Sequence, residues 1–297
     1  MNRKVLLFVP IVVAILALVY FQSLETEKKQ SEVKKIEGVP ITQNFEIDEK
    51  SSTSYDLEMV DDSLLFRVYG KEGEDFMISE DGSPVWASAK IFPKAELQEI
   101  YDEVGVRKDP QNTVVIYPIF TSSAYKSPGF YDYYSKRCDE KCLTTKIEVT
   151  LDSTSSGVGI QVLALLGYEI VNDLYVDKNP EKLKDYDKVI VLHNEYVTKT
   201  EFDAITNHPK VVYLYPNANY AEVKVDYEAE TITLIRGHGY QNVSNAFGWE
   251  FDNTPQEYDK ECKNWEFYQI DNGIMLNCEP ESLILVDKEF LKAIKEY

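Results

Sequence analysis

Apolar and polar residues alternate in the segment 51–92 of this chain. Phe66 and Val68 occupy every second position of one run, and Asp81-Gly82 separates two later runs of the same kind. A period of two is the pattern of a strand with one buried face, and Asp-Gly favours a tight hairpin turn. The segment therefore predicts a small antiparallel β unit.

From residue 93 onward, continuous apolar runs alternate with segments of helical periodicity. Pro93 opens a predicted helix that ends at Gly105, Ser155 or Ser156 begins another, and the capping sequence beginning at Thr198 begins a third. Strands are predicted at 113–120, 146–150, 168–172, 188–192 and 211–215. This alternation is typical of a mostly parallel sheet with helices on both faces. We therefore predict an α/β domain over residues 93–297.

The pattern changes again after Pro216. Residues 221–226 and 231–236 predict a hairpin, and the loop-rich, aromatic segment 237–278 is expected to cover one edge of the sheet. The apolar run 283–286 predicts a late strand, and Asp287 is expected to cap a final helix.

The N-terminus carries a membrane-directed segment. Residues 5–21 form an apolar run behind Arg3 and Lys4, and no small-residue cleavage site follows it. We predict an uncleaved signal anchor (1–22) in the cell membrane, with a cleaved signal peptide as the alternative. The positive-inside rule then places the polar stalk (23–50) and the following domains outside the cytoplasm.

Charge and cysteine content narrow the partners and the compartment. The formal net charge is −20, and no basic stripe follows the N-terminus, so nucleic-acid binding is excluded. Four cysteines occur, Cys138, Cys142, Cys262 and Cys278. In an exported chain an even count favours disulfides over a zinc site, whose usual spacings are not matched here. Three pairings remain open.

The residues His193-Asn194-Glu195-Tyr196 directly follow the apolar strand 188–192. Open α/β sheets bind their ligands outside the carboxyl ends of the strands, so this cluster is the first candidate site. The structural alternative is that the His satisfies loop carbonyls and the Glu lies at the start of the next helix for its dipole.

A nucleophile elbow of the amidotransferase type is missing. After the strand 211–215 the chain reads Pro216-Asn217-Ala218-Asn219-Tyr220, without Cys or Ser. Cys-His catalysis also lacks a suitable pair at a strand end.

Tyrosines supply a different chemistry. Tyr125 follows the first buried strand, and Tyr131, Tyr133 and Tyr134 come soon after it. Phenol and carboxylate oxygens together form a hard ligand set that suits ferric iron better than zinc or copper(I). Such an ion can polarise an amide carbonyl and activate water. The alternative is packing, because the chain holds 21 tyrosines and aromatic residues at a sheet edge commonly pack.

The segments 167–170, 183–192 and 193–196 resemble the C-terminal domain of the large subunit of N,N-dimethylformamidase and its relatives. The resemblance covers residues 112–252, with Ala124-Tyr125, Asn219-Tyr220 and a Gly-aromatic-Glu-x-Asp element at 248–252 in corresponding places. It implies a fold of the class I glutamine amidotransferase or flavodoxin type without the elbow. The domain 93–297 is thus expected to be dimethylformamidase-like.

The same resemblance implies a mononuclear iron site and hydrolysis of small amides. Glu195 is then a metal ligand, Tyr125 a second, and one of Tyr131, Tyr133 or Tyr134 the third. His193 becomes a proton-transfer or orienting group, and Glu250 a second carboxylate. The rival interpretation is a non-catalytic surface module that keeps the fold and binds a ligand or protein.

Overall fold

The computed structural model describes residues 58–61, 64–71, 76–78, 84–86, 89–109, 111–149, 156–237, 245–251, 259 and 262–297. The predicted anchor (1–22) and stalk (23–50) lie outside these residues. Among the residues that are described, no helix has the length and apolar character needed to cross a membrane.

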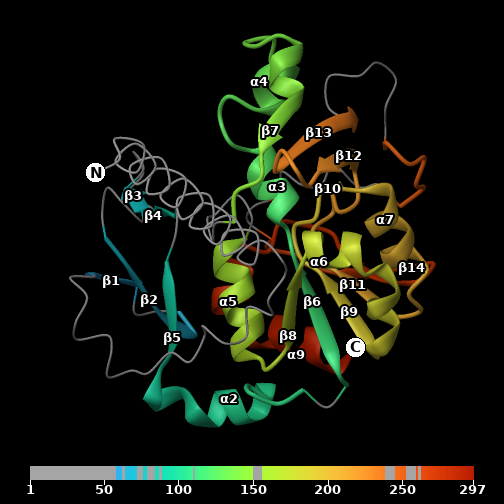
Figure 1. The fold of residues 1–297 in the computed structure, drawn as a ribbon. Coiled ribbons are helices and arrows are strands. Elements are labelled where there is room, and N and C mark those ends of the chain that lie inside the picture. The colour runs from blue at the N-terminus through green and yellow to red at the C-terminus, as the bar shows by residue number, and fades with distance from the viewer. Residues whose placement is uncertain are drawn as a thin grey trace, which may run out of the picture. The chain divides into compact units, whose positions relative to one another are not determined.

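The main sheet has six strands in the order β14-β15-β11-β9-β6-β8 (Figure 1). Their bounds are β6 (Thr113–Tyr117), β8 (Glu169–Asn172), β9 (Lys188–Val191), β11 (Val211–Tyr213), β14 (Phe267–Ile270) and β15 (Gly273–Leu276). Neighbouring strands are parallel, except that β14 and β15 form an antiparallel hairpin at one edge. The predicted α/β class is confirmed.

The order of the parallel strands creates a reversal in the middle of the sheet. In chain order these strands are β6, β8, β9, β11 and β15, so their order across the sheet is 2-1-3-4-5. The chain leaves β6 toward one side of the sheet and later continues from β9 toward the other side. The loops after β6 and β9 therefore diverge at the carboxyl edge, and open α/β sheets bind ligands at such a point.

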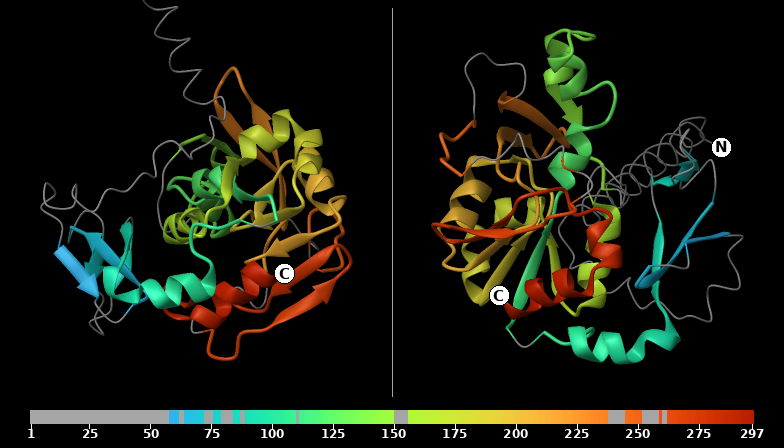
Figure 2. Two further views of the ribbon diagram at one scale, coloured as in Figure 1. Left: turned by 90° about the horizontal axis from the view of Figure 1, so that it is seen from below. Right: turned by 180° about the vertical axis from the view of Figure 1, so that it is seen from behind.

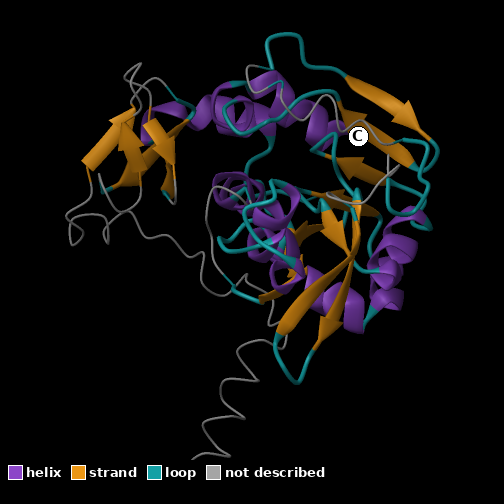
Figure 3. Cartoon of the chain, turned by 90° about the horizontal axis from the view of Figure 1, so that it is seen from above, coloured by secondary structure: helices purple, strands orange, loops and turns teal. Residues whose placement is uncertain are grey.

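Helices cover both faces of this sheet, as Figure 3 shows from above. Alternate residues of a strand point to opposite faces, and Val114, Val189 and Val211 pack on one face with Val176 of α6 (Asp173–Lys178) and Ile205 of α7 (Lys199–Thr206). The other face is covered by α5 (Gly157–Leu165) and α9 (Lys288–Glu296). These two helices contact the residues that alternate with those of the first face along the chain. Burial of both faces explains why the strands are continuous apolar runs.

Several helix ends follow the predicted signals. The Thr198 side chain caps α7 by accepting from the Glu201 N–H at 3.0 Å, and Asp287 caps α9. Gly167 follows α5 with a φ of +94°, in the left-handed region where a side chain is strained. The predicted helix at 93–105 begins later than expected, because Pro93 ends strand β5 (Lys90–Pro93); a 3₁₀ turn (Ala95–Leu97) and α2 (Gln98–Val104) follow.

Two predicted strands are corrected. The strand expected at 113–120 ends at Tyr117, because Pro118 follows and the chain turns into α3 (Ile119–Ala124). The strand expected at 146–150 is β7 (Thr144–Lys146) instead. It belongs to a second sheet, β10-β12-β13-β7, that also contains β10 (Tyr196–Val197), β12 (Ala221–Asp226) and β13 (Thr231–Arg236). The predicted hairpin at 221–226 and 231–236 is confirmed.

The C-terminal part differs from the expectation in two ways. The segment predicted as loop-rich contains β14 and β15, which extend the main sheet beside β11 (Figure 2). The apolar run predicted as a late strand is the short helix α8 (Leu283–Val286), whose Ile284 N–H donates to the Pro280 carbonyl. Four apolar residues in a row suit a buried helix turn as well as a strand, and periodicity does not separate them.

The predicted antiparallel β unit is confirmed. Strands β1 (Glu58–Asp61), β2 (Phe66–Gly70) and β5 form one antiparallel sheet, and β3 (Phe76–Ile78) pairs with β4 (Pro84–Trp86). The Gln161 side chain of α5 binds the backbone of Ala89 and Ile91, at 2.7 and 3.2 Å. These bonds fasten β5 to the α/β domain.

Candidate functional site

Glu195 lies at the centre of a polar cluster at the carboxyl edge of the main sheet. The residue has no exposed surface, and in the described part of the chain the side chains of Tyr125, Tyr131 and Asn217 donate to its carboxylate. Tyr125 donates to Oε2, Asn217 Nδ2 donates to the same oxygen at 3.2 Å, and Tyr131 donates to Oε1 at 3.4 Å. Two phenols from one segment thus approach the two oxygens of one glutamate. We call Tyr125, Tyr131, His193, Glu195 and Asn217 the Glu195 cluster.

The segment after β6 brings both tyrosines to this point. Tyr125 directly follows helix α3, a cis peptide bond joins Ser127 and Pro128, and α4 (Phe130–Tyr134) carries Tyr131. The rings of Tyr125 and Tyr131 contact edge to face, with centroids 5.0 Å apart. The sequence places the tyrosines one short turn apart, and the fold of that turn makes them converge.

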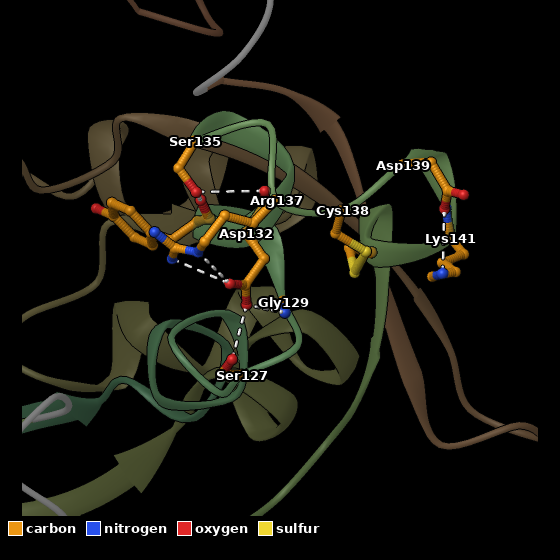
Figure 4. The surroundings of a disulfide bond; sticks show 10 residues. Ser127, Gly129, Asp132, Ser135, Arg137, Cys138, Asp139 and Lys141 are labelled. Carbon is orange, nitrogen blue, oxygen red and sulfur yellow. Dashed lines mark hydrogen bonds and ion pairs between the residues drawn. A yellow bond between two sulfur atoms is a disulfide. The ribbon is translucent and has the colours of Figure 1, made fainter.

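Asp132 holds the turn before α4 together. Its carboxylate accepts from the Gly129 N–H and the Ser127 hydroxyl, each at 2.9 Å, and from Arg137 Nε at 3.0 Å (Figure 4). These donors lower the pKa of Asp132, the Gly129 N–H contributing most. The Cys138–Cys142 disulfide closes the loop that follows.

Both cysteine pairs form disulfides, as the even cysteine count predicts. Cys138 joins Cys142, and Cys262 joins Cys278 near the β14–β15 hairpin. The zinc alternative is thereby excluded, and the pairing that the sequence left open is resolved.

The loop after β9 positions Glu195 through its backbone. The N–H groups of Glu195 and Tyr196 both donate to the Thr121 hydroxyl of α3, at 3.1 and 3.2 Å. Residues 192–195 connect β9 to the two-residue strand β10, and α7 begins only after that strand. Helix α3 contributes to the site twice, through Thr121 and through the tyrosine at its end.

His193 lies beside the carboxylate. Its ring stacks on Tyr215, with centroids 4.1 Å apart and an interplanar angle of 13°. Its Nε2 lies 3.4 Å from the Tyr125 hydroxyl and 3.4 Å from Asn217 Nδ2. The imidazole can therefore exchange a proton with the phenol that binds Glu195. The predicted strand-end cluster and the predicted tyrosine segment meet at this residue.

Three of the predicted site residues lie outside the Glu195 cluster. Tyr134 is 53% exposed and contacts the Tyr131 ring by its edge, and Glu250 is exposed on a turn. No hydrogen bond or ring contact of the Tyr133 side chain occurs among the described residues. Of the three tyrosines considered for a third ligand, Tyr131 is the one that reaches Glu195.

Asn217 belongs to the cluster although the sequence pattern did not single it out. The family resemblance includes Asn219-Tyr220 rather than Asn217. The Asn219 side chain, however, has no hydrogen-bond partner in the described part of the chain. Asn219 instead donates its backbone N–H to the Asn194 carbonyl at 2.7 Å. Asn217 is a polar residue just after a parallel strand, which is the signal that pointed to His193 and Glu195.

Burial determines the protonation of the phenols. Desolvation first, and then the negative charge of Glu195, raise the pKa of Tyr125 well above its ordinary value, and the same two causes act on Tyr196. Without a cation the tyrosines are neutral donors. Two phenolates beside a buried carboxylate would need a compensating positive charge.

These groups fit a hard, highly charged metal ion. All three potential ligand atoms are oxygens, and a trivalent cation would supply the charge that two phenolates and Glu195 require. Within the described ranges, no group of three or more His, Cys, Asp or Glu side chains has a metal-binding arrangement.

No protein-family model matches the chain, and a search of the curated proteins also finds no match.

Proposed function

We propose that the Glu195 cluster binds ferric iron through Glu195, Tyr125 and Tyr131, and that the protein hydrolyses the C–N bond of small amides. The observation that carries this proposal is the approach of two tyrosine hydroxyls to the two oxygens of one buried glutamate. The cluster also lies between the ends of β6 and β9, where the strand order reverses.

A bound ferric ion would polarise the amide carbonyl and make water nucleophilic near neutral pH. The chain's own residues then have separate tasks. Asn217 donates to Glu195 and fixes the orientation of the carboxylate. His193 is placed to hold or move a proton at Nε2, next to the Tyr125 oxygen. The stacked Tyr215 ring keeps the imidazole in that position.

We also propose the dimethylformamidase-like family and fold for residues 93–297. The strand order 2-1-3-4-5 is that of flavodoxin-like sheets, and the residues after β11 hold no elbow nucleophile, as the resemblance implies. The membrane anchor at 1–22 and a position outside the cytoplasm are part of the same proposal. Two disulfides favour an oxidising compartment.

The test is iron binding by the full chain in detergent. Wild-type protein loaded with ferric iron should hold one ion per chain and show a visible tyrosinate-to-iron charge-transfer band. Tyr125→Phe, Tyr131→Phe and Glu195→Ala should each lose the band while remaining folded, whereas Tyr133→Phe should keep it. The amide activity is assayed by amine release from formamide and dimethylformamide. Folded wild-type protein that takes up no iron would refute the metal site.

The second candidate is a non-catalytic surface module that binds a ligand or protein. It is favoured by one observation, that Tyr125 and Glu195 hydrogen-bond each other directly and so satisfy their polar groups without a metal. Stable, iron-free protein without amide hydrolysis, in which the tyrosine variants fold normally, supports this candidate.

A further inference from the structure

His193 lies between two tyrosine–glutamate pairs. On one side Tyr125 donates to Glu195. On the other side the imidazole stacks on Tyr215, whose hydroxyl donates to Glu281 Oε1. Tyr215 follows β11, and Glu281 lies shortly before α8, 66 positions further along the chain. The second pair is outside the Glu195 cluster, and only the fold brings it next to His193.

The Tyr215 hydroxyl is held from two directions. Besides Glu281 Oε1 it contacts the Ser156 hydroxyl, with the two oxygens 3.0 Å apart. A phenol has one proton to donate, a carboxylate only accepts, and a serine hydroxyl does either. Tyr215 therefore donates to Glu281 and accepts from Ser156. Burial first, and then the charge of Glu281, raise the pKa of Tyr215 well above its ordinary value, so the phenol keeps this proton.

Ser156 occupies a strained backbone position at the start of α5. It precedes the helix with a φ of +55°, in the left-handed region that is unfavourable for a residue other than glycine. Its side chain is buried and makes no capping hydrogen bond to the helix, although the sequence predicts a helix start here. Gly159 leaves room for the hydroxyl, because a Cβ at that position would lie 2.5 Å from Ser156 Oγ. The bond to Tyr215 thus replaces the local cap.

The segment that carries Glu281 is anchored on both sides. Before it, the Glu279 N–H donates to the Asp259 carbonyl at 3.0 Å, and Cys278 is bonded to Cys262. After it, the chain enters the helical turn of α8. The glutamate therefore reaches Tyr215 from a fixed part of the backbone.

We infer that Glu281 and Ser156 are positioning residues for His193. Their two hydrogen bonds fix the hydroxyl end of the Tyr215 ring, and the face of that ring holds the imidazole parallel to it. In this position His193 Nε2 lies 3.4 Å from the Tyr125 oxygen. Without the two bonds the Tyr215 ring can tilt, and His193 loses its place beside Tyr125. The positioning does not require a metal, whereas its use in amide hydrolysis rests on the proposed function.

Nuclear magnetic resonance of the iron-free full chain in detergent tests this inference separately from the iron site. The reporter is the nuclear Overhauser contact between the His193 imidazole and the Tyr125 ring, whose centroids are 5.7 Å apart. The chain has three histidines, and samples of His193→Gln and Tyr125→Phe identify the two signals. Tyr215→Phe keeps the ring but removes the hydroxyl, and it should lose the contact. Glu281→Ala should lose it too, whereas Glu281→Gln, whose amide oxygen accepts the same bond, should retain it. Ser156→Ala should weaken the contact, because it removes the second bond to the phenol.

Two controls separate positioning from a general loss of structure. Tyr213→Phe removes the hydroxyl of another buried tyrosine, which donates to Asn272, and should leave the reporter contact unchanged. The His208 signal should be the same in all variants, because its ring nitrogens contact backbone carbonyls at the amino edge of the sheet. The inference is overturned if wild type lacks the reporter contact, if Tyr215→Phe keeps it in full, or if Glu281→Ala and Glu281→Gln behave alike. The role of Ser156 is refuted if Ser156→Ala keeps the full contact. If Glu281→Ala does not fold, the comparison of Tyr215→Phe with Tyr213→Phe still decides.

Discussion

The hydrogen bond between Tyr125 and Glu195 should be measurable as an interaction energy in the iron-free protein. Glu195 is fully buried and accepts from Tyr125, Asn217 and Tyr131. Hydrogen bonds to charged groups contribute about 1.5–3 kcal/mol each. Tyr125→Phe removes one of three donors and leaves the other two, so we expect the free energy of unfolding to fall by about 2 kcal/mol.

A double-mutant cycle isolates this interaction. Glu195→Gln keeps the shape of the side chain and removes its charge, so the Tyr125→Phe change should cost less in that background. The expected coupling energy is about 1–2 kcal/mol. Urea unfolding of the iron-free full chain, with the slope unchanged among variants, gives all four free energies.

The control is Tyr133→Phe, on the following helix α4, which should change the free energy of unfolding by less than about 0.5 kcal/mol. A coupling energy below about 0.5 kcal/mol between Tyr125 and Glu195 would refute the hydrogen-bonded cluster. In that case Tyr125 would only pack against the sheet edge, as the alternative derived from the sequence holds.

Three other changes have defined outcomes. Replacing Cys262 and Cys278 by Ala opens a loop with a sequence separation of 16 and should lower the free energy of unfolding by about 3 kcal/mol, so equal urea midpoints of this variant and oxidised wild type would contradict the estimate. Burial lowers the pKa of Lys188 in the folded chain to about 8, from its ordinary value of 10.5. Between these two pH values the unfolded chain binds more protons than the folded chain, so the free energy of unfolding should rise with pH across that window. Lys188→Met should flatten this rise in a pH series of thermal melts, and an unchanged slope would show that another group titrates. In Gly129→Ala the new Cβ would lie 2.1 Å from the Lys126 carbonyl, so the turn before α4 must shift, and a loss of about 1–3 kcal/mol is expected from urea unfolding, whereas wild-type stability would show that the turn accepts a side chain.

The local signals of the sequence predicted most elements of the α/β domain. Apolar runs of β-branched residues identified β6, β8, β9 and β11, and the caps at Thr198 and Asp287 located the last two long helices. These signals succeed because burial of both sheet faces and capping of exposed N–H groups are local requirements. The prediction that the cysteines form disulfides succeeded for a similar reason, since it depends on the number of cysteines and on the expected compartment. Which cysteines pair with each other could be read only from the fold.

The errors lie where short segments depend on a distant partner. The run at 283–286 is a helix, whereas 267–276 forms two strands. Strand β15 of that segment pairs with β11, and this pairing depends on the assembled sheet rather than on the local sequence. Pro118 is a local signal: it ends β6 three residues before the predicted end.

For the site, the sequence alone determined which residues stand at the carboxyl ends of parallel strands, and that rule identified His193 and Glu195. The tertiary structure decided which tyrosine joins them, since Tyr131, Tyr133 and Tyr134 are equivalent by position and only the fold of the turn directs Tyr131 to Glu195. It also revealed Asn217, whose side-chain amide reaches Glu195 from the loop after β11. Strand pattern is a local property of the chain, whereas the convergence of side chains from different loops depends on the order in which the strands are assembled.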